Sequence, residues 1–306
     1  MSHGEETPAN LRNHYVICNW NDLGEEIVRQ LHAPVVEEKK PIVIVTEHPE
    51  EVLPRELRQD TRKDSYEPPQ DDLYHGVYIV PGDPTSDQVL ARADIKHAET
   101  AMVLSDPREK EFADTKSVLI ALAVEAIEPQ VHTIVELLHS KNRIHFKHTL
   151  VDEIVCMDEL TEKLLAQAAL THGLSEFYMR LLTATRDTNE VYVVAVPEDF
   201  EGHPYSEIER AISDYAHESL ILVGVQTGAV ALSDGSEITN RHGRCIQKRV
   251  LTINPPSQQE LAEREDLREL SLMTRDYKLR KGDEVFLLAY KPPNLSWLKP
   301  PPDTSG

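Results

Sequence analysis

Polar and acidic side chains follow the apolar runs in the first half of this sequence, each at the point where an extended run ends. Such runs predict parallel strands, and the carboxyl ends of parallel strands form the edge at which open α/β sheets bind ligands. We therefore expect these side chains to share one cleft. The residues concerned are Asn19, Asn21, Asp22, Leu23, Gly24, Glu47, His48, Gly82, Asp83, Ser105, Asp106 and Glu136.

The stretch NWNDLG, residues 19–24, is similar to the phosphate-binding turn of dinucleotide folds but lacks two of its glycines. Asn19 and Asn21 stand where the first two glycines of GxGxxG would be, and Gly24 matches the third. Asparagine tolerates left-handed backbone angles, so we expect the turn to survive, with both side chains projecting where phosphates would lie. Glu47, about 20 residues further on, is placed to accept hydrogen bonds from a ribose diol, although an exposed carboxylate without a ligand fits the spacing equally well.

Two carboxylates point to a second kind of ligand. Asp106 and Glu136 end neighbouring predicted strands, and converging carboxylates are the oxygen ligands that Ca²⁺ and Mg²⁺ prefer. The alternative is that each carboxylate faces water singly. His145 and His148 could also share a metal, but without a third ligand a surface histidine pair is the preferred interpretation. No nucleophile with an adjacent base, nucleophile elbow or P-loop stands out, so an enzyme is not indicated.

The elements that position these residues are expected to alternate between strand and helix from His14 to Met157, which predicts a Rossmann-like doubly wound parallel sheet. The strands are predicted at residues 14–18, 41–47, 77–83, 99–106, 131–138 and 152–157. Helices are predicted after Gly24, after a capping box formed by Thr85 and Gln88, from Phe112 to Ile127, and from Asn142 to His148.

The pattern changes after the sixth predicted strand. Residues 159–185 predict two helices broken at Gly173, and a smaller mixed α+β subdomain is expected to follow. Its strands are predicted at 191–197, 219–232 with a turn at Thr227 and Gly228, 248–253 and 283–290, its helix at 205–216, and its loops at 235–244 and 255–270. A polar surface insertion is predicted at 58–75, and a proline-rich extended tail at 293–306.

Composition limits the classes of partner. Fifty-three acidic residues against thirty-two basic ones give a net charge of -21, which repels nucleic acid and anionic lipid surfaces. The three cysteines, Cys18, Cys156 and Cys245, have no CxxC spacing and suit a reducing cytosol. No window reaches the roughly 20 apolar residues of a membrane helix, so the chain as given is expected to be soluble, although it could be the cytoplasmic part of a longer protein.

The order of elements resembles the RCK domain, regulator of conductance of potassium. The residues that carry the resemblance are NHYVICNW at the first strand, GDPTSDQVLARADIKHAETAMVLSD across the third and fourth, and VHTIVELLHSKNRIHFKHTLVDEIV across the fifth and sixth. The resemblance implies an N-terminal Rossmann-like subdomain at 12–157, dimerising crossover helices at 158–189, a C-terminal subdomain at 190–292 and a tail at 293–306.

The resemblance further implies a cytoplasmic gating module at the inner face of the membrane. RCK domains pair into homodimers that assemble into tetrameric or octameric rings, and they bind NAD(H), ATP, ADP or Ca²⁺ to regulate a potassium channel or transporter. Carried over by position, residues 19–24 would face the phosphates, Glu47 the ribose, and Gly82 with Asp83 the adenosine side of a cleft that also includes His48 and Ser105. Glu136 matches a calcium ligand of the family, but Leu138 stands where a second glutamate is expected.

Three interpretations remain open at this point. The NWND stretch is closer to channel-type RCK sequences than to the soluble subunits of potassium uptake transporters, so a channel is favoured and a transporter subunit is the alternative. Divalent-ion sensing without a nucleotide is compatible with the acidic strand ends. An NAD(P)-dependent oxidoreductase would use the same sheet, but no proton donor at a suitable spacing stands out.

Overall fold

The computed structural model describes residues 11–33, 36, 38–52, 75–147, 149–183, 189–214, 219–227, 250–263 and 273–300. The chain divides into two compact units, residues 1–176 and 177–306, which are treated separately below. The predicted insertion at 58–75 lies outside the described residues except for its last residue. The predicted loop at 235–244, residue 148 and the end of the tail also lie outside them.

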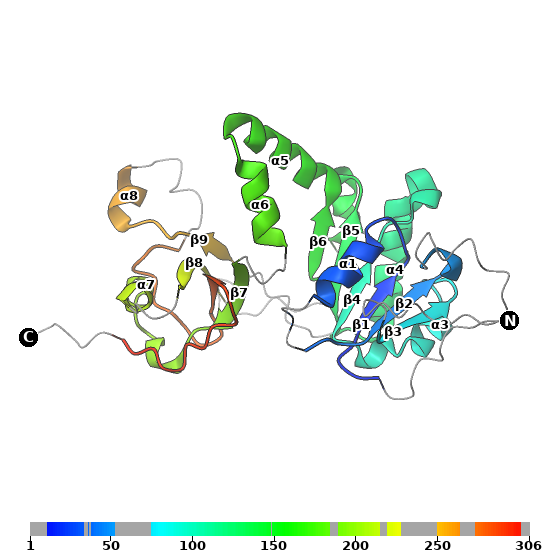
Figure 1. Ribbon diagram of the computed structural model, residues 1–306, viewed down its shortest axis with the longest axis horizontal. Coiled ribbons are helices and arrows are strands. Elements are labelled where there is room, and N and C mark those ends of the chain that lie inside the picture. The colour runs from blue at the N-terminus through cyan, green and yellow to red at the C-terminus, as the bar shows by residue number, and fades with distance from the viewer. Residues whose placement is uncertain are drawn as a thin grey trace, which may run out of the picture. The chain divides into compact units, whose positions relative to one another are not determined.

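The first unit is built around a six-stranded, fully parallel sheet with the strand order β3-β2-β1-β4-β5-β6 (Figure 1). Its strands are β1 (Tyr15–Cys18), β2 (Ile42–Thr46), β3 (Val77–Pro81), β4 (Thr100–Val103), β5 (His132–Leu137) and β6 (Glu153–Cys156). Each predicted strand of this half is confirmed. Because most strands end earlier than predicted, the polar residues stand just beyond the strand ends rather than within them.

The connections of this unit are α-helices and short 3₁₀ helices. They are α1 (Gly24–Leu31), η1 (Pro49–Glu51), α3 (Asp87–Arg92), η3 (Ile95–His97), η4 (Pro107–Phe112), α4 (Ala113–Ile127), η5 (Ser140–Phe146) and α5 (Met157–Leu170). The helix α6 (Leu174–Leu182) follows, and the division between the two units falls within it. The predicted capping box is wrong: α3 begins after Ser86, and no side chain caps it. The predicted helix from Asn142 is a 3₁₀ helix that starts at Ser140.

Both faces of the parallel sheet are buried, which explains its nearly continuous apolar strands. Alternate residues of β1 and β2 enter two different core clusters, with Val16 and Val43 in one and Ile17 and Ile44 in the other. The first cluster is completed by residues of α3 and α4, and the second by residues of α1. The sheet is therefore rigidly held between helices, and its strand ends have fixed positions.

The second unit contains a four-stranded antiparallel sheet with the order β7-β10-β8-β9 (Figure 1). Its elements are β7 (Glu190–Ala195), η6 (Glu198–Phe200), α7 (Tyr205–Asp214), β8 (Ile221–Gln226), β9 (Leu251–Ile253), α8 (Gln258–Glu263) and β10 (Glu284–Ala289). A core that includes Phe200, Tyr205 and Ile208 packs on one face of this sheet. The predicted α+β character of this part is confirmed.

One element of the second unit contradicts the sequence prediction. Residues 255–270 were expected to form a loop, but α8 lies within them. The backbone N–H of Ser257 donates to Glu260 Oε2, and the N–H of Glu260 donates to Ser257 Oγ, which is the reciprocal bonding of a capping box. The Ser-x-x-Glu spacing was a readable signal for this helix. Among the described residues, no helix is both long and apolar enough to cross a membrane.

Candidate functional site

The turn after β1 keeps a left-handed backbone conformation at the position of the first lost glycine. Asn19 has φ 68°, in the left-handed region, as predicted for this position. Its N–H donates to the Val45 carbonyl at 2.8 Å, and its side-chain amide donates to the Leu104 carbonyl at 3.0 Å. The side chain is buried, so Asn19 fastens the end of β1 to the ends of the strands on both sides.

Asn21 makes a second set of internal bonds. Its Nδ2 donates to the Ser105 carbonyl and to Glu136 Oε2, both at 2.9 Å, while its Oδ1 accepts from the N–H of Leu23 at 3.0 Å. The expectation that the two asparagine side chains project where phosphates would lie is therefore wrong. Their amides turn towards the β4 and β5 ends because buried carbonyl and carboxylate oxygens there need donors.

Glu136 is the common acceptor of this arrangement. Its Oε2 accepts from the Ser105 N–H at 2.8 Å as well as from Asn21, and the Ser105 hydroxyl donates to the Glu136 carbonyl at 3.3 Å. Ser105 is fully buried and Glu136 nearly so. We call Asn19, Asn21, Leu104, Ser105 and Glu136 the strand-end network. It joins the ends of β1, β4 and β5, so a ligand that pulls on Glu136 would disturb all three.

Gly24 is required by its neighbour rather than by a ligand. A Cβ at this position would lie 2.6 Å from the ring of Trp20, which is only 5% exposed and packs in the core under α1. The indole fills the space beneath the first turn of α1. Gly24 therefore serves the role of the third glycine, which is close packing between helix and sheet.

The start of α1 offers little to a phosphate. The N–H of Leu23 donates to the Asn21 side chain, and the N–H of Gly24 donates to the Asn21 carbonyl at 3.1 Å. Glu25 and Glu26 occupy the first turn of the helix. Their carboxylates satisfy the positive end of the helix dipole and repel an anion placed there. The half-exposed Leu23 and the exposed Asp22 complete the turn.

Asp106 is held by basic side chains beyond the end of β4. Its Oδ1 accepts from the N–H of Arg108 at 3.0 Å and from Arg108 Nε at 2.8 Å, and Lys116 Nζ lies 3.9 Å from its Oδ2. Burial alone would raise the pKa of Asp106, but these bonds and charges hold that pKa below its usual range. Asp106 and Glu136 therefore bind different partners in this structure, although both stand at the same sheet edge.

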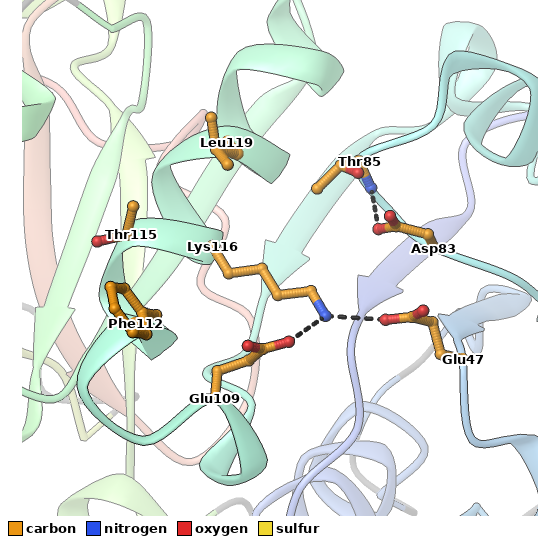
Figure 2. Close-up of a pocket in the computed structure, with 8 residues that line it drawn as sticks. All are labelled: Glu47, Asp83, Thr85, Glu109, Phe112, Thr115, Lys116 and Leu119. Atoms are coloured by element: carbon orange, nitrogen blue, oxygen red, sulfur yellow. Dashed lines mark hydrogen bonds and ion pairs between the residues drawn. The ribbon is translucent and has the colours of Figure 1, made fainter.

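A pocket of about 480 Å³ opens at the ends of β2 and β3, beside η4 and α4 (Figure 2). The residues that line it are Glu47, Asp83, Thr85, Glu109, Phe112, Thr115, Lys116 and Leu119. Two of the predicted cleft residues, Glu47 and Asp83, are among them. The exposed side chains of Phe112 and Leu119 give the pocket an apolar side across from Glu47 and Asp83.

Lys116 is the basic residue of this pocket, and it is one of several lining residues that sequence reasoning missed. Its Nζ lies 2.8 Å from Glu47 Oε2 and 2.8 Å from Glu109 Oε1, and Figure 2 shows it reaching between the two carboxylates. Burial would lower the pKa of Lys116, but the two carboxylates outweigh it and raise that pKa. The available signal was that Lys116 is the single lysine of a largely apolar helix. Its charged end cannot pack in the core and therefore needs an acidic partner or water.

Gly82 and Asp83 form the turn at the end of β3. Gly82 has φ 145°, its N–H donates to the Thr46 carbonyl at 2.9 Å, and a Cβ there would lie 2.8 Å from Val89. Asp83 Oδ1 accepts from the N–H of Thr85 at 2.9 Å. The turn is thereby fixed with the Asp83 carboxylate at the pocket wall. His48 does not line the pocket; it precedes η1, and its N–H donates to Thr46 Oγ1.

Asp114 is a further buried carboxylate without a predicted role. It accepts from the N–H groups of Leu138 and His139 and from the amide of Asn142. These bonds satisfy the backbone after β5 and hold η5 against α4, so Asp114 serves the fold rather than a ligand.

Comparisons with known proteins find several to which this sheet is similar. Residues 10–135 match the model described as the calcium-activated potassium channel slowpoke-like RCK domain. The calcium-gated potassium channel TvoK of Thermoplasma volcanium is 27% identical over 181 residues, covering 58% of this chain and 46% of the channel. The putative potassium channel protein YugO of Bacillus subtilis is 24% identical over 226 residues, covering 70% of this chain and 58% of its own length.

The fold of the whole chain also has a solved counterpart. The human SLO3 gating ring superposes with a TM-score of 0.55 at 16% identity, covering 91% of this chain and 44% of that one. The chain spans about half the length of the channels it matches. The predicted resemblance to RCK domains is confirmed, and the proteins with which it is shared are potassium channels by name.

Proposed function

Residues 10–135 match a slowpoke-like RCK domain, and from this premise we propose that the chain is a ligand-sensing regulatory domain controlling potassium transport. It would lie in the cytoplasm, at the inner face of the membrane, and act as part of a gating ring. The observation that carries the proposal is that the matched residues include β1 to β4 and every residue that lines the pocket, while Glu136 of the strand-end network follows directly after the match. A ligand bound there changes gating only to the extent that it binds the two ring states unequally.

The first candidate ligand is NAD(H) or an adenine nucleotide in the pocket of Figure 2. Glu47 would accept hydrogen bonds from the ribose hydroxyls, Asp83 would face the adenosine side, and Phe112 offers an exposed ring beside the base. Lys116 would release Glu47 and turn to a phosphate. Because the start of α1 is already satisfied internally, the adenosine half of the ligand is expected to supply most of the affinity.

The second candidate ligand is Ca²⁺ at Asp106 and Glu136. Both carboxylates stand at the strand ends, and the net charge of -21 raises the local concentration of divalent cations. Binding would have to displace Arg108 from Asp106, or Ser105 and Asn21 from Glu136. Such a displacement would couple the ion directly to the strand-end network.

Calorimetric titration of the full chain with NAD⁺, NADH, ATP, ADP and Ca²⁺ tests both candidates. Glu47→Gln is expected to weaken a nucleotide about tenfold and to leave Ca²⁺ binding unchanged, because it removes a charged acceptor of the ribose. The matched control is Glu162→Gln, an exposed glutamate on α5. Absence of heat with every nucleotide would refute the nucleotide, and turnover of NADH would favour the alternative of an oxidoreductase.

Assembly is proposed to use the crossover helices α5 and α6. Large apolar side chains lie exposed along them in the single chain, with Leu165 67% and Leu170 77% exposed. Such side chains mark an interaction surface, and we infer a homodimer that builds a tetrameric or octameric ring. Light scattering should show Leu170→Glu shifted to monomer and the control Gln88→Glu, at an exposed position of α3, unshifted. Equal masses for the two variants would refute this surface.

The membrane partner is proposed to be a potassium channel pore belonging to the same longer protein, since the named relatives are channels and the matched part spans only about half of their length. A separate transporter subunit is the alternative. Reading the coding sequence before Met1 decides between them: two hydrophobic helices with a TVGYG-like filter indicate the channel.

A further inference from the structure

Three side chains with metal-ligand atoms gather on the turn that follows β2. His48, Glu50 and Glu51 each offer one nitrogen or oxygen atom, and these atoms all lie within 4.8 Å of one another. His48 Nδ1 lies 3.4 Å from Glu50 Oε1. This cluster lies outside the pocket and involves neither Asp106 nor Glu136, so it is separate from the ligand positions proposed above.

The local backbone explains why the three side chains converge. The N–H of His48 donates to Thr46 Oγ1, which turns the chain as β2 ends, and Pro49 opens the 3₁₀ helix η1. A 3₁₀ helix has three residues per turn, so His48 and Glu51 stand on the same side of it. The N–H of Glu51 donates to the His48 carbonyl at 3.0 Å and closes the turn.

The donor set favours one class of ion. An imidazole nitrogen with two carboxylate oxygens suits Zn²⁺ and neighbouring transition metals, whereas Ca²⁺ takes oxygen ligands. In a tetrahedral zinc site with bonds of about 2.0–2.1 Å, neighbouring ligand atoms lie about 3.3 Å apart. The distance of 3.4 Å between His48 Nδ1 and Glu50 Oε1 matches that edge. We propose that His48, Glu50 and Glu51 form a binding site for Zn²⁺ or a similar transition metal, with water completing the coordination.

The site is linked to the wall of the pocket through Arg108. In the metal-free arrangement Arg108 Nη1 lies 2.9 Å from Glu51 Oε1, while its Nε bonds Asp106. A metal that draws the Glu51 carboxylate to itself weakens this ion pair and leaves Arg108 with Asp106. Metal occupancy therefore loosens the tie between η1 and η4, and η4 carries Glu109 and Phe112 of the pocket.

Cobalt titration of the full chain tests the site, because tetrahedral Co²⁺ has a visible absorption that an octahedral surface ion lacks. At pH 7.5 the wild-type chain should bind one tightly held Co²⁺ with this absorption, and Zn²⁺ should displace it. His48→Ala should weaken binding at least tenfold and abolish the absorption, since even residues that only support metal ligands contribute that much to affinity. His145→Ala, which removes an exposed histidine on η5, is the matched control and should bind as the wild type does.

A second variant and a check of folding separate loss of the metal ligand from loss of structure. Glu50→Gln removes a more exposed ligand, so it tests the site even if His48→Ala does not fold. Circular dichroism shows whether each variant keeps its structure. If the absorption persists in both His48→Ala and Glu50→Gln, or if the wild-type chain shows none, the proposed site is refuted.

Discussion

Glu136 offers the sharpest test of the strand-end network. Replacing it by leucine removes the acceptor of two N–H groups, those of Ser105 and Asn21. The Ser105 N–H is then left in a fully buried position, and a buried donor without a partner costs about 1–3 kcal/mol. The Asn21 amide keeps its hydrogen bond to the Ser105 carbonyl, so its loss of Glu136 costs less free energy than the loss at the Ser105 N–H. We expect Glu136→Leu to lower the free energy of unfolding of the first unit by about 2–4 kcal/mol.

Glu136→Gln separates the bonds from the charge. The glutamine oxygen can still accept from Ser105, so the loss should be about 1 kcal/mol, the difference between a charged and a neutral acceptor. Glu111→Leu, at an exposed position outside the strand-end network and outside α5 and α6, should change stability by less than about 0.5 kcal/mol. We therefore predict that the loss of unfolding free energy is largest for Glu136→Leu, smaller for Glu136→Gln and smallest for the control variant.

Urea unfolding in the presence of a chelator measures these differences. The chain has two tryptophans, and Trp297 belongs to the second unit, so a Trp297→Phe background leaves Trp20 to report on the first unit alone. This matters because a chain of two units need not unfold in one step. If Glu136→Leu were as stable as the control, Glu136 would not be holding the ends of β1, β4 and β5, and the reasoning would be wrong.

Three further predictions concern single residues of the same sheet. Gly24→Ala should destabilise the first unit by about 1–3 kcal/mol in urea, because the methyl group meets the Trp20 ring and outweighs the better helix propensity of alanine; Trp20→Leu in addition should restore part of the loss. The pKa of Asp106 is depressed in the folded state, so its contribution to stability is present above about pH 4 and lost as the pH falls through the folded pKa. Arg108→Gln should therefore cost about 1–2 kcal/mol in unfolding experiments at pH 7, with a gap to wild type that narrows as the pH falls through the folded pKa of Asp106; a constant gap would contradict this. Burial raises the pKa of the Cys18 thiol to about 12, so peptide mapping after alkylation at pH 8 should find Cys18 labelled only in denaturant.

The parallel sheet could be predicted because its signal is local. Each strand is a short apolar run, and β2 is buried along its whole length. The second unit gave a weaker signal, since β7 alternates between partly buried and exposed residues and the helix α8 is only six residues long. The Ser-x-x-Glu spacing of Ser257 and Glu260 indicated the start of that helix, but the charged residues around it favoured a loop.

The position of the candidate site at the sheet edge could be predicted from the sequence, but the hydrogen bonds within it could not. Sequence reasoning located Glu47 and Asp83 at a sheet edge, and both line the pocket. It could not foresee that Asn21 would turn to Glu136, because that bond joins residues separated by 115 positions. Arg108 and Lys116 were missed for the same reason: a charged side chain on a helix reveals its partner only when the helix is packed.

The central place of β1 in the sheet has a consequence for how the chain is made. β1 pairs with β2 on one side and with β4 on the other, and the Asn19 amide finds its acceptor in Leu104, 85 residues later. At a synthesis rate of about 5–20 residues per second, β1 waits roughly 5–15 seconds with one edge unpaired and both faces apolar. An open strand edge of this kind recruits other chains. Growth temperature and the supply of chaperones should therefore govern the yield of soluble protein more strongly than the stability of the finished fold does.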